Sequence, residues 1–392
     1  MIVAGVMSGT SADGINVALV RIISDSETSL SLALLGSLEV SYPNMVRQAI
    51  LKAMNARHAS VADLARLNFL LGELYADAVL GAQRKFNTKA ELIGCHGQTL
   101  YHQAESAKFL TRRVAATWQT GEGSIIAART GAPVVCDFRP ADIAASGKGA
   151  PLVPFLDYLI YRDQNIGRIV QNIGGIANLT AIPANAAPEQ VFAFDTGPGN
   201  MVMDALTERL FGKSCDRDGK IAASGRVSDR VVRDLLKQTY FRRKPPKTAG
   251  REEFGREFVA AFRRLCGRAK KQDIVATATA LTAASIAHAI ERYVLAKAGQ
   301  SKNAQSGNVR FAELVVSGGG TANPALMAML ANRVRPLGLE IRLSDEFGIP
   351  SEAKEAIAFA VLAYQTWHHR ASNIPSATGA KRPAILGKIC YA

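Results

Sequence analysis

The stretch IVAGVMSGTSADGINVALV, residues 2–20, sets the first expectation about the fold. Apolar runs flank the segment 5–14, which holds three glycines, several hydroxyl side chains and the carboxylate of Asp13. This pattern predicts two strands joined by a glycine-rich turn. Glycine permits positive φ and lets backbone amides approach an anion closely. The stretch is therefore compatible with an ordinary β-turn and also with a cradle for phosphate groups.

The rest of the first half predicts more strands and two helices. An S-x-x-D capping box at Ser60–Asp63 opens a helix whose apolar residues keep helical spacing to about Phe86. The segment GSIIAARTGAPVVCDFR, residues 123–139, predicts a helix and then a strand. The strands that we expect in this half cover residues 2–7, 15–23, 31–41 and 92–95.

The second half repeats the order of elements in the first. RIVQNIGGIANLTAIP, residues 168–183, again predicts strand, glycine turn and strand. A strand, turn and helix follow around FDTGPGN, residues 194–200, and a strand, triple-glycine turn and helix follow around residues 313–334. This duplication predicts an α/β protein of two similar domains that face each other across an interdomain cleft.

The domain boundaries are predicted from length and composition. A chain of 392 residues is too long for one domain of typical size, about 100–200 residues. Residues 140–154 are rich in Gly, Ala, Ser and Pro, which is typical of a crossing between domains. We expect an N-terminal domain of residues 1–140 plus about 372–392, and a C-terminal domain of residues 141–371.

Charge and cysteine content argue against several classes of protein. The net charge is +14, but its basic clusters at 241–247 and 263–271 lack aromatic interleaving and any nucleic-acid module pattern, so we favour a solvated surface over a nucleic-acid partner. Five scattered cysteines without a CxxC pair disfavour disulfides and zinc and are compatible with a reducing cytoplasm. The N-terminus lacks a signal-peptide pattern, and the apolar runs are too short to predict a membrane span.

Glycine turns that follow apolar strands are the first candidate binding elements. They lie at 9–14, 174–175 and 318–320. One such turn is weak support, because hairpins need glycine for their own geometry. Three in one chain favour nucleotide binding over plain turns, and they match neither the P-loop nor the GxGxxG pattern.

Asp195 is the candidate general base. It ends an apolar strand, where an α/β sheet presents catalytic groups. The alternative role is a helix N-cap, but Asn200 is better placed for that. The nearby helix N-terminus lowers the expected pKa of Asp195, while desolvation on cleft closure raises it.

Other polar residues follow the predicted strands or open the last long helix. His96–Thr99 and Arg139 come after strands, so their side chains are candidates for the cleft. His96 is equally compatible with a buried imidazole, and Arg139 with an interdomain ion pair. Glu355 lies on the first turns of the helix entered at Ser351, where it is either a cleft residue or a surface residue.

Seven of these motifs, in order, resemble the anhydro-N-acetylmuramic acid kinase family. The resemblance extends from Gly5 to the tail SATGAKRPAILGKI and implies two ribonuclease-H-like domains of the actin/hexokinase/Hsp70 type. It also implies a cytoplasmic homodimer that uses ATP and Mg²⁺ on a small anhydro sugar. The motifs are MSGTSADG, GCHGQTLYH, DFRPADIAASGKGAPLVP, NIGGIANLT, FDTGPGNMVMDA, SGGGTANPALM and EAIAFAVLAY.

The resemblance implies a reaction and a role for each matching residue. Family members hydrolyse the 1,6-anhydro bond of 1,6-anhydro-N-acetylmuramic acid and phosphorylate O6 in cell-wall recycling. Asp195 matches the general base, and Asp13 and Glu355 match carboxylates that orient Mg²⁺, with Glu355 also near the reacting groups. His96, Gly97, Gln98, Thr99 and Arg139 match the sugar-binding surface. The residues that match the nucleotide site are Ser8, Gly9, Thr10, Ser11, Ala12, Asp13, Gly14, Ile15, Asn16, Gly174, Gly175, Gly318, Gly319 and Gly320.

The chain departs from the family pattern at a few positions. Asn16 and Glu122 stand where Asp is common, and Ser146 and Lys148 stand where Gly and Gln are common. Lys148 is a hypothetical partner for a lactyl carboxylate. Two other functions remain open from the sequence: a levoglucosan-type kinase of plain anhydrohexoses, and a regulator that binds sugar or nucleotide without turnover.

Overall fold

The chain divides into two units, and each is described separately. The computed structural model describes residues 1–9, 12–26, 29–54, 56–299 and 311–392. The first unit is Met1–Leu159 with Gly348–Ala392, and the second unit is Ile160–Phe347. The chain therefore passes between the units after residue 159 and after residue 347, and not near the predicted positions 140 and 372. The segment 140–154 and the last long helix both belong to the first unit.

The first unit contains a six-stranded mixed sheet in the order β13-β7-β4-β1-β2-β3. β1, β4 and β7 are parallel, while β2 is antiparallel to both of its neighbours and β13 is antiparallel to β7. A separate hairpin, β5-β6, follows β4. The strands are β1 Ile2–Met7, β2 Gly14–Ser26, β3 Ser29–Ser41, β4 Leu92–Cys95, β5 Gln98–Phe109, β6 Arg112–Thr120, β7 Val134–Cys136 and β13 Lys388–Cys390.

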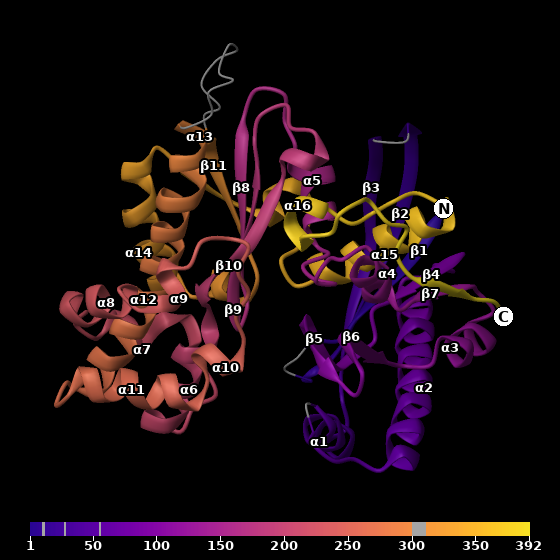
Figure 1. The fold of residues 1–392 in the computed structure, drawn as a ribbon, viewed down its shortest axis with the longest axis horizontal. Coiled ribbons are helices and arrows are strands. Elements are labelled where there is room, and N and C mark those ends of the chain that lie inside the picture. Colours follow the sequence, from indigo (N-terminus) through magenta and orange to yellow (C-terminus); the bar gives the residue numbers. More distant parts are fainter. Residues whose placement is uncertain (10–11, 27–28, 55, 300–310) are drawn as a thin grey trace. The chain divides into compact units, whose positions relative to one another are not determined.

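Helices of the first unit pack on this sheet. The predicted helix after Ser60 is α2, and the Ser60 hydroxyl accepts a hydrogen bond from the Asp63 N–H at 3.3 Å, which confirms the N-cap. Figure 1 shows α15 in yellow beside β1 and β2. The helices are α1 Asn44–Ala53, α2 Val61–Lys85, α3 Gly123–Thr130, α4 Phe138–Ala144, α5 Pro154–Tyr161 (which crosses into the second unit), α15 Lys354–Trp367 and α16 Pro375–Thr378.

Two glycines let α15 lie directly on the sheet. Gly5 of β1 and Gly94 of β4 are paired neighbours on parallel strands. A Cβ on Gly5 would stand 1.8 Å from the Ala356 carbonyl oxygen, and one on Gly94 would stand 2.1 Å from the Phe359 carbonyl oxygen. Real Cβ atoms do not come that close, so only glycine allows this packing. The contact makes α15 part of the first unit.

The second unit repeats the topology of the first. Its sheet has the order β10-β9-β8-β11-β12, with β8, β11 and β12 parallel and β9 antiparallel to β8 and β10. The first unit has the same order and directions in β3-β2-β1-β4-β7. The predicted duplication of an α/β unit is confirmed. The strands are β8 Gly167–Ile173, β9 Ile176–Ile182, β10 Phe192–Pro198, β11 Phe311–Ser317 and β12 Glu340–Leu343.

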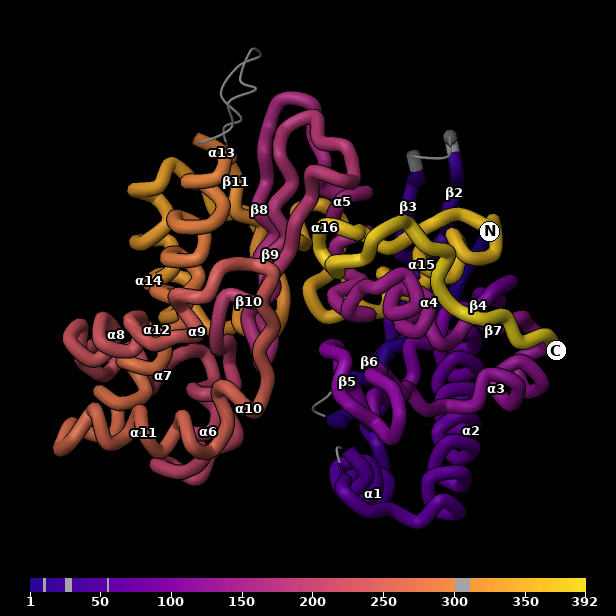
Figure 2. The backbone as a smooth tube through the Cα atoms, in the orientation of Figure 1, coloured from indigo at the N-terminus to yellow at the C-terminus, as the bar shows by residue number. Residues whose placement is uncertain are grey.

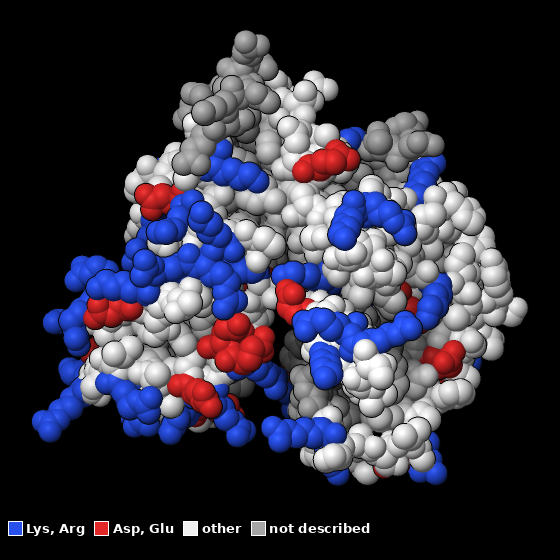
Figure 3. Space-filling model, in the orientation of Figure 1, with Lys and Arg blue, Asp and Glu red and all other residues white. Residues whose placement is uncertain are grey.

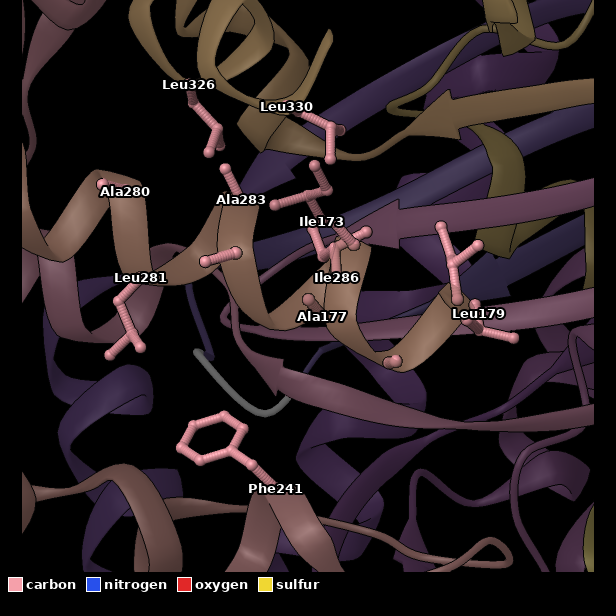
Figure 4. Close-up of a cluster of buried hydrophobic side chains, with 14 of the residues drawn as sticks. Ile173, Ala177, Leu179, Phe241, Ala280, Leu281, Ala283, Ile286, Leu326 and Leu330 are labelled. Carbon is pink, nitrogen blue, oxygen red and sulfur yellow. The ribbon is translucent and has the colours of Figure 1, made fainter. Parts of the chain in front are cut away.

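A buried helix forms the centre of the second unit. In Figure 4, side chains of α12 lie among residues of β8 and β9 and the α14 residues Leu326 and Leu330. Figure 2 traces α12 and α14 side by side. The helices are α6 Asn200–Phe211, α7 Lys220–Ala223, α8 Asp229–Leu236, α9 Thr239–Arg242, α10 Arg251–Phe254, α11 Arg256–Cys266, α12 Lys271–Ala289, α13 Ala296–Gly299 and α14 Pro324–Val334.

One helical segment resembles a membrane span by composition. Lys271–Gly299 is long and apolar enough to cross a bilayer, but 89% of its apolar window is buried inside the unit. That burial is typical of the core helix of a globular protein. Alternating Ala and Thr residues fill the window, and hydroxyls such as that of Thr279 bond to carbonyls of their own helix.

Several elements were absent from the sequence prediction or placed differently. The β5-β6 hairpin and helix α1 were not predicted, and neither were α7–α11. Asn200 is the first residue of α6 rather than its N-cap; the N-cap is Gly199, and no side chain bonds there. The physical reason is that the α6 N–H groups are taken by carbonyls of the 174–175 turn.

Replacement of Gly5 by Ala should destabilise the protein. The added methyl group meets the backbone of α15, which cannot move aside as a flexible side chain would, so we expect a loss of about 1–3 kcal/mol in unfolding free energy. Urea unfolding would measure it. Gly81→Ala in α2 is the control, because its Cβ would make only ordinary contacts, at 3.6 Å and beyond. Equal stabilities of the two variants would contradict the role of Gly5.

Candidate functional site

Predicted site residues of the first unit follow the carboxyl ends of three parallel strands. β1 leads into the 8–14 turn, β4 into His96–Thr99, and β7 into Asp137–Arg139. Carboxyl ends of parallel strands meet at one edge of a sheet, which is where α/β proteins bind ligands. Glu355 joins this edge at the start of α15 and interacts electrostatically with Arg139.

The turn between β1 and β2 is tightly bonded at its ends. The Ala12 N–H donates to the Gly9 carbonyl at 3.1 Å, and Ala12 is buried with φ at 53°, in the left-handed region. A Cβ on Gly14 would stand 2.6 Å from the Val40 carbonyl oxygen. Ile15 is buried, and Asn16 pairs with Met7 across the hairpin. Thr10 and Ser11, which were predicted to bind phosphate, lie outside the described residues.

A chain of buried hydroxyls anchors the start of this turn. Ser8 donates to Gln98 Oε1 at 2.6 Å and accepts from the Tyr42 hydroxyl at 2.9 Å. The Tyr75 hydroxyl lies 3.1 Å from the Tyr42 hydroxyl. Gln98 also donates through Nε2 to the Gly9 carbonyl at 3.2 Å. Ser8 and Gln98 therefore bond to each other and fix the turn; a phosphate at Ser8 would have to be met by its backbone.

His96 is a neutral acceptor for Arg139. Its Nδ1 lies 2.7 Å from the Gly97 carbonyl, and Arg139 Nε donates to its Nε2 at 3.1 Å. Burial, followed by the charge of Arg139, lowers the pKa of His96 to about 3. The proton is thus assigned to Nδ1, which donates to Gly97. The alternative of a satisfied buried imidazole describes His96 well, and its ring orients Arg139.

Arg139 and Thr99 complete this group. Arg139 also donates through Nη1 to the Gly149 carbonyl at 3.4 Å. Burial lowers the pKa of Arg139 to about 10, so the guanidinium stays charged at neutral pH. Thr99 Oγ1 accepts from Gln119 Nε2 at 3.2 Å, across the β5-β6 hairpin. Gly97 adopts φ of 75°, which lets the chain turn from β4 into this hairpin.

Glu355 is held next to a buried ion pair. Its neighbour Lys354 pairs with Asp157 at 2.7 Å, and both side chains are buried. The carboxylate of Glu355 itself is exposed, yet desolvation by the surrounding protein raises its pKa, against the lowering effects of Lys354 and then Arg139. The two cations beside it oppose direct coordination of a metal ion, so this carboxylate is better suited to bind water, including a water of a hydrated Mg²⁺.

Asp13 is the second carboxylate of the predicted metal site. It is exposed and pairs with Arg47 of α1, with Nη2 and Oδ1 3.1 Å apart. Carboxylate oxygens suit Mg²⁺, which keeps most of its waters and needs few protein ligands. Across the described ranges, no three His, Cys, Asp or Glu side chains gather into a group that could hold a metal.

A buried carboxylate that sequence reasoning missed organises the loop after α4. Asp142 accepts from the Gly149 N–H at 2.8 Å and from the side chains of Asn373 and Thr378, both at 2.7 Å. No local pattern in the motif DFRPADIAASGKGAP marks this aspartate as buried, so the sequence could not identify it. Nearby, Lys148 pairs with Glu105 at 2.9 Å, so this ammonium already has a carboxylate partner.

Glu122, one of the departures from the family pattern, has a structural role. Its Oε1 accepts from the Ser124 N–H at 3.1 Å, which caps α3, and its Oε2 accepts from Asn68 of α2 at 3.1 Å. Asn68 in turn accepts from the Gly121 N–H at 2.8 Å. The residue therefore ties α3 to α2.

The predicted residues of the second unit meet at the corresponding edge of its sheet. β8 and β10 run in the same direction, because β9 is antiparallel to both, and β11 is parallel to β8. The 174–175 and 318–320 turns therefore lie at carboxyl ends, whereas Asp195 lies inside β10, which continues to Pro198; the expectation that Asp195 ends its strand was wrong. The structure groups these three predicted elements within the second unit.

The two glycine turns of the second unit are packed against their own unit. N–H groups of Gly199, Asn200 and Met201 donate to the carbonyls of Gly174 and Gly175 at 2.7–3.1 Å. Gly318 has φ of 88°, and a Cβ there would stand 2.5 Å from Asn172 Oδ1. By contrast, Gly319 would meet nothing closer than 3.6 Å, so its backbone has open space before it.

Asp195 lies in β10 at an irregularity of the sheet. The β9-β10 register shifts between Asp195 and Gly197. Such bulges re-aim a side chain and are frequent near active sites. Oδ2 of Asp195 accepts from the Ala249 N–H at 2.7 Å, and the Tyr240 hydroxyl donates to its backbone carbonyl at 2.8 Å. Asp195 is thus fixed by the segment after α9 and does not cap α6.

The environment of Asp195 suits proton transfer. Desolvation by burial raises its pKa to about 7, against the lowering effects of the Ala249 N–H and then Lys247. A general base works best with a pKa near the operating pH. Desolvation is the largest of these effects, so the pKa of Asp195 is raised and not lowered.

Most of the basic clusters are surface, as expected, but one lysine is not. Figure 3 shows Lys and Arg gathered over α9 and its surroundings. Arg242, Arg243 and Lys244 are exposed there. Lys247 of the same run is only 3% exposed. Its surroundings could not be read from the composition of the run.

The low pKa of His96 predicts a pH-dependent contribution to stability. The unfolded chain binds a proton on this side chain below about pH 6.5, while the folded chain does not until about pH 3. Stability should therefore fall as the pH falls from 6.5 toward 3, by about 2 kcal/mol at pH 5. Urea unfolding at about pH 6.5 and about pH 5 would measure how much unfolding free energy each protein loses. Wild type should lose more than His96→Gln, while His58→Gln, at an exposed histidine, is the control and should behave like wild type. An equal loss in all three proteins would contradict a neutral His96.

The chain is similar to known proteins over its whole length. The sequence profile of the family described as anhydro-N-acetylmuramic acid kinase matches residues 1–392. The chain is 40% identical to proteins of that name from Bacillus cereus (strain AH820) and Bacillus thuringiensis subsp. konkukian, over 100% of this chain and 99% of each relative.

Two solved structures are also similar to the chain. One is the activator of the 2-hydroxyisocaproyl-CoA dehydratase from Clostridium difficile with bound ADPNP, at 13% identity and a TM-score of 0.43, over 94% of this chain and 96% of that one. The other is a ROK family glucokinase from Streptomyces griseus in complex with glucose and AMPPNP, at 13% identity and a TM-score of 0.39, over 93% and 100%.

Proposed function

The chain belongs to the anhydro-N-acetylmuramic acid kinase family, and we propose that it performs that family's reaction with Asp195 as the general base. In this reaction the 1,6-anhydro bond of 1,6-anhydro-N-acetylmuramic acid is hydrolysed and O6 is phosphorylated by ATP, in peptidoglycan recycling. The observation that supports this assignment is the Asp195 carboxyl group, which is desolvated to a pKa of about 7 and aimed by a bulge in β10.

The proposed reaction needs one base. Asp195 takes a proton from a water molecule as that water attacks C1 of the sugar. The bond between C1 and O6 breaks, and its electron pair stays on O6. O6 then attacks the γ-phosphorus of ATP, and the bond to the bridging oxygen of ADP breaks. Because ring opening itself produces the nucleophile, no second base is required, and the remaining work is positioning and charge stabilisation.

Residues of the first unit are proposed to hold the two substrates. Backbone groups of the 9–14 turn would meet the phosphates of ATP, and charged Arg139, oriented by His96, would bond the sugar. Asp13 and Glu355 would hold Mg²⁺ largely through its waters. That ion, when bound, neutralises phosphate charge. In the second unit, we propose that the 174–175 and 318–320 turns face the nucleotide, with open backbone at Gly319.

Two further features of the proposal come from the family resemblance. We keep a cytoplasmic location and a homodimer as predictions. Both concern the whole protein and are independent of the assignment of the base.

An ATP-consumption assay with three sugars tests the function directly. The sugars are 1,6-anhydro-N-acetylmuramic acid, levoglucosan and N-acetylmuramic acid. We expect ADP release only with the first. Preference for levoglucosan would indicate a kinase of plain anhydrohexoses, and ADP release with N-acetylmuramic acid would mean that ring opening is not coupled to transfer. Binding of sugar and ATP without turnover would indicate a regulator.

Asp195→Asn should reduce kcat by at least about a hundredfold while ATP binding stays within about twofold. The amide cannot accept the water proton, and general-base catalysis is worth about 10²–10⁴. The ATP assay measures turnover, and isothermal titration calorimetry measures binding. Asp234→Asn, at an exposed carboxylate of α8 in the same unit, is the control and should keep wild-type rates. Wild-type turnover by Asp195→Asn would refute the assignment.

A further inference from the structure

The segment around Lys247 covers the free edge of β10. β10 is the edge strand of its sheet, so its outer N–H and C=O groups need partners. The Asp195 N–H donates to the Lys247 carbonyl at 3.1 Å, and the Ala249 N–H donates to the Asp195 carboxylate at 2.7 Å. Backbone and side chain of Asp195 are thus both bonded to residues 247–249.

The Lys247 side chain points inward, into a group of aromatic rings. Its Nζ lies 4.7 Å from the centre of the Tyr240 ring, 5.1 Å from Tyr293 and 5.9 Å from Phe194. Nζ also donates to the Tyr240 carbonyl at 3.3 Å. A buried ammonium is costly unless hydrogen bonds or aromatic faces replace its water. These contacts do so, and they allow the ammonium to be buried there.

Two of these aromatic residues adjoin the candidate base. Phe194 precedes Asp195 in β10, and the Tyr240 hydroxyl donates to the Asp195 carbonyl. The ammonium therefore lies beside a ring whose hydroxyl group bonds to the backbone of Asp195. A structural role alone would be served as well by an apolar side chain of the same length, so the charge calls for another explanation.

We propose that Lys247 is a positioning residue: its backbone carbonyl holds Asp195 at the sheet edge, and its buried ammonium favours the ionised form of that carboxyl group. The proposal rests on Asp195 as the base. It adds that a loop outside the glycine motifs tunes that base. Removal of the ammonium should make Asp195 bind its proton more tightly, so the base should be ionised only at higher pH.

Other charged groups act on this pair from the surrounding elements. Glu253 and Glu252 of α10 raise the pKa of Asp195. Burial, then Arg243, and finally Arg292 lower the pKa of Lys247 to about 8, while Asp195 raises it. His288 of α12 also interacts with Lys247, and its own pKa is lowered by burial. All of these residues are kept when Lys247 is replaced, so the variants below differ from the wild type only in the side chain at this position.

Two variants at Lys247 test the proposal. Lys247→Met keeps the length and removes the charge, and Lys247→Arg keeps the charge. For wild type, kcat/KM should fall below about pH 7 as Asp195 is protonated. In Lys247→Met this acid limb should move up by about one pH unit, which lowers kcat/KM about tenfold at pH 6 and hardly at pH 9. Lys247→Arg should keep the wild-type limb.

A direct measurement of the carboxyl group separates this inference from the proposed function. Protein labelled with ¹³C at Asp carboxyl carbons is titrated by NMR, and the Asp195 signal is assigned by its loss in Asp195→Asn. Its midpoint should rise in Lys247→Met and stay in Lys247→Arg. Thermal unfolding should show that both variants are folded.

Three outcomes decide the matter. An unchanged Asp195 midpoint in Lys247→Met would overturn the inference. A loss of kcat/KM by the same factor at every pH would do so too, because it would show a purely structural role. Turnover by Asp195→Asn would refute the base, yet a shifted Asp195 midpoint in Lys247→Met would then still support the electrostatic link.

Discussion

The first unit depends on the absence of two side chains. Gly5 and Gly94 stand side by side on β1 and β4, and the backbone of α15 occupies the space where their Cβ atoms would be. A helix this close to a sheet has little freedom to tilt or slide. Glu355 at its first turn and the buried Lys354–Asp157 pair are therefore placed by a backbone contact. Through the same contact, a helix near the C-terminus packs on a sheet whose first strand begins at residue 2.

Several buried polar side chains of this molecule fix loops. Ser8, Gln98 and Tyr42 bond in series beneath the 8–14 turn, and Asp142 ties the loop after α4 to residues near the C-terminus. An unpaired buried polar group is costly, so each of these networks specifies one arrangement of its loop. A ligand-binding edge built from loops needs that precision, because loops have no regular hydrogen bonding of their own.

Asp195 illustrates how a fold creates reactivity. The carboxyl group sits in the strand at the sheet edge, where a bulge re-aims it, and a distant segment supplies one N–H and one ammonium. Burial alone would raise its pKa further, and the N–H and the ammonium oppose that rise. The balance leaves the pKa of Asp195 at about 7, so near neutral pH the group can both accept and release a proton.

Local patterns in the sequence determined the strands, the duplication and the positions of the polar motifs. Strand alternation, the Ser60 cap and the strand–glycine–strand repeats act over a few residues, so they can be recognised without a structure. The family motifs extend this to the candidate base, the glycine turns and the carboxylates.

Tertiary structure alone decided that α15 belongs to the first unit. It also decided which groups Ser8 and His96 bond to and what Lys247 contacts. The run FRRKPPK is hydrophilic and resembles surface throughout, yet one of its lysines enters an aromatic core. The boundaries between the two units also differ from the predicted positions, because they depend on contacts between distant residues. Contacts between residues far apart in the chain carry no local signal, and burial, charge pairing and close backbone approach arise only from such contacts.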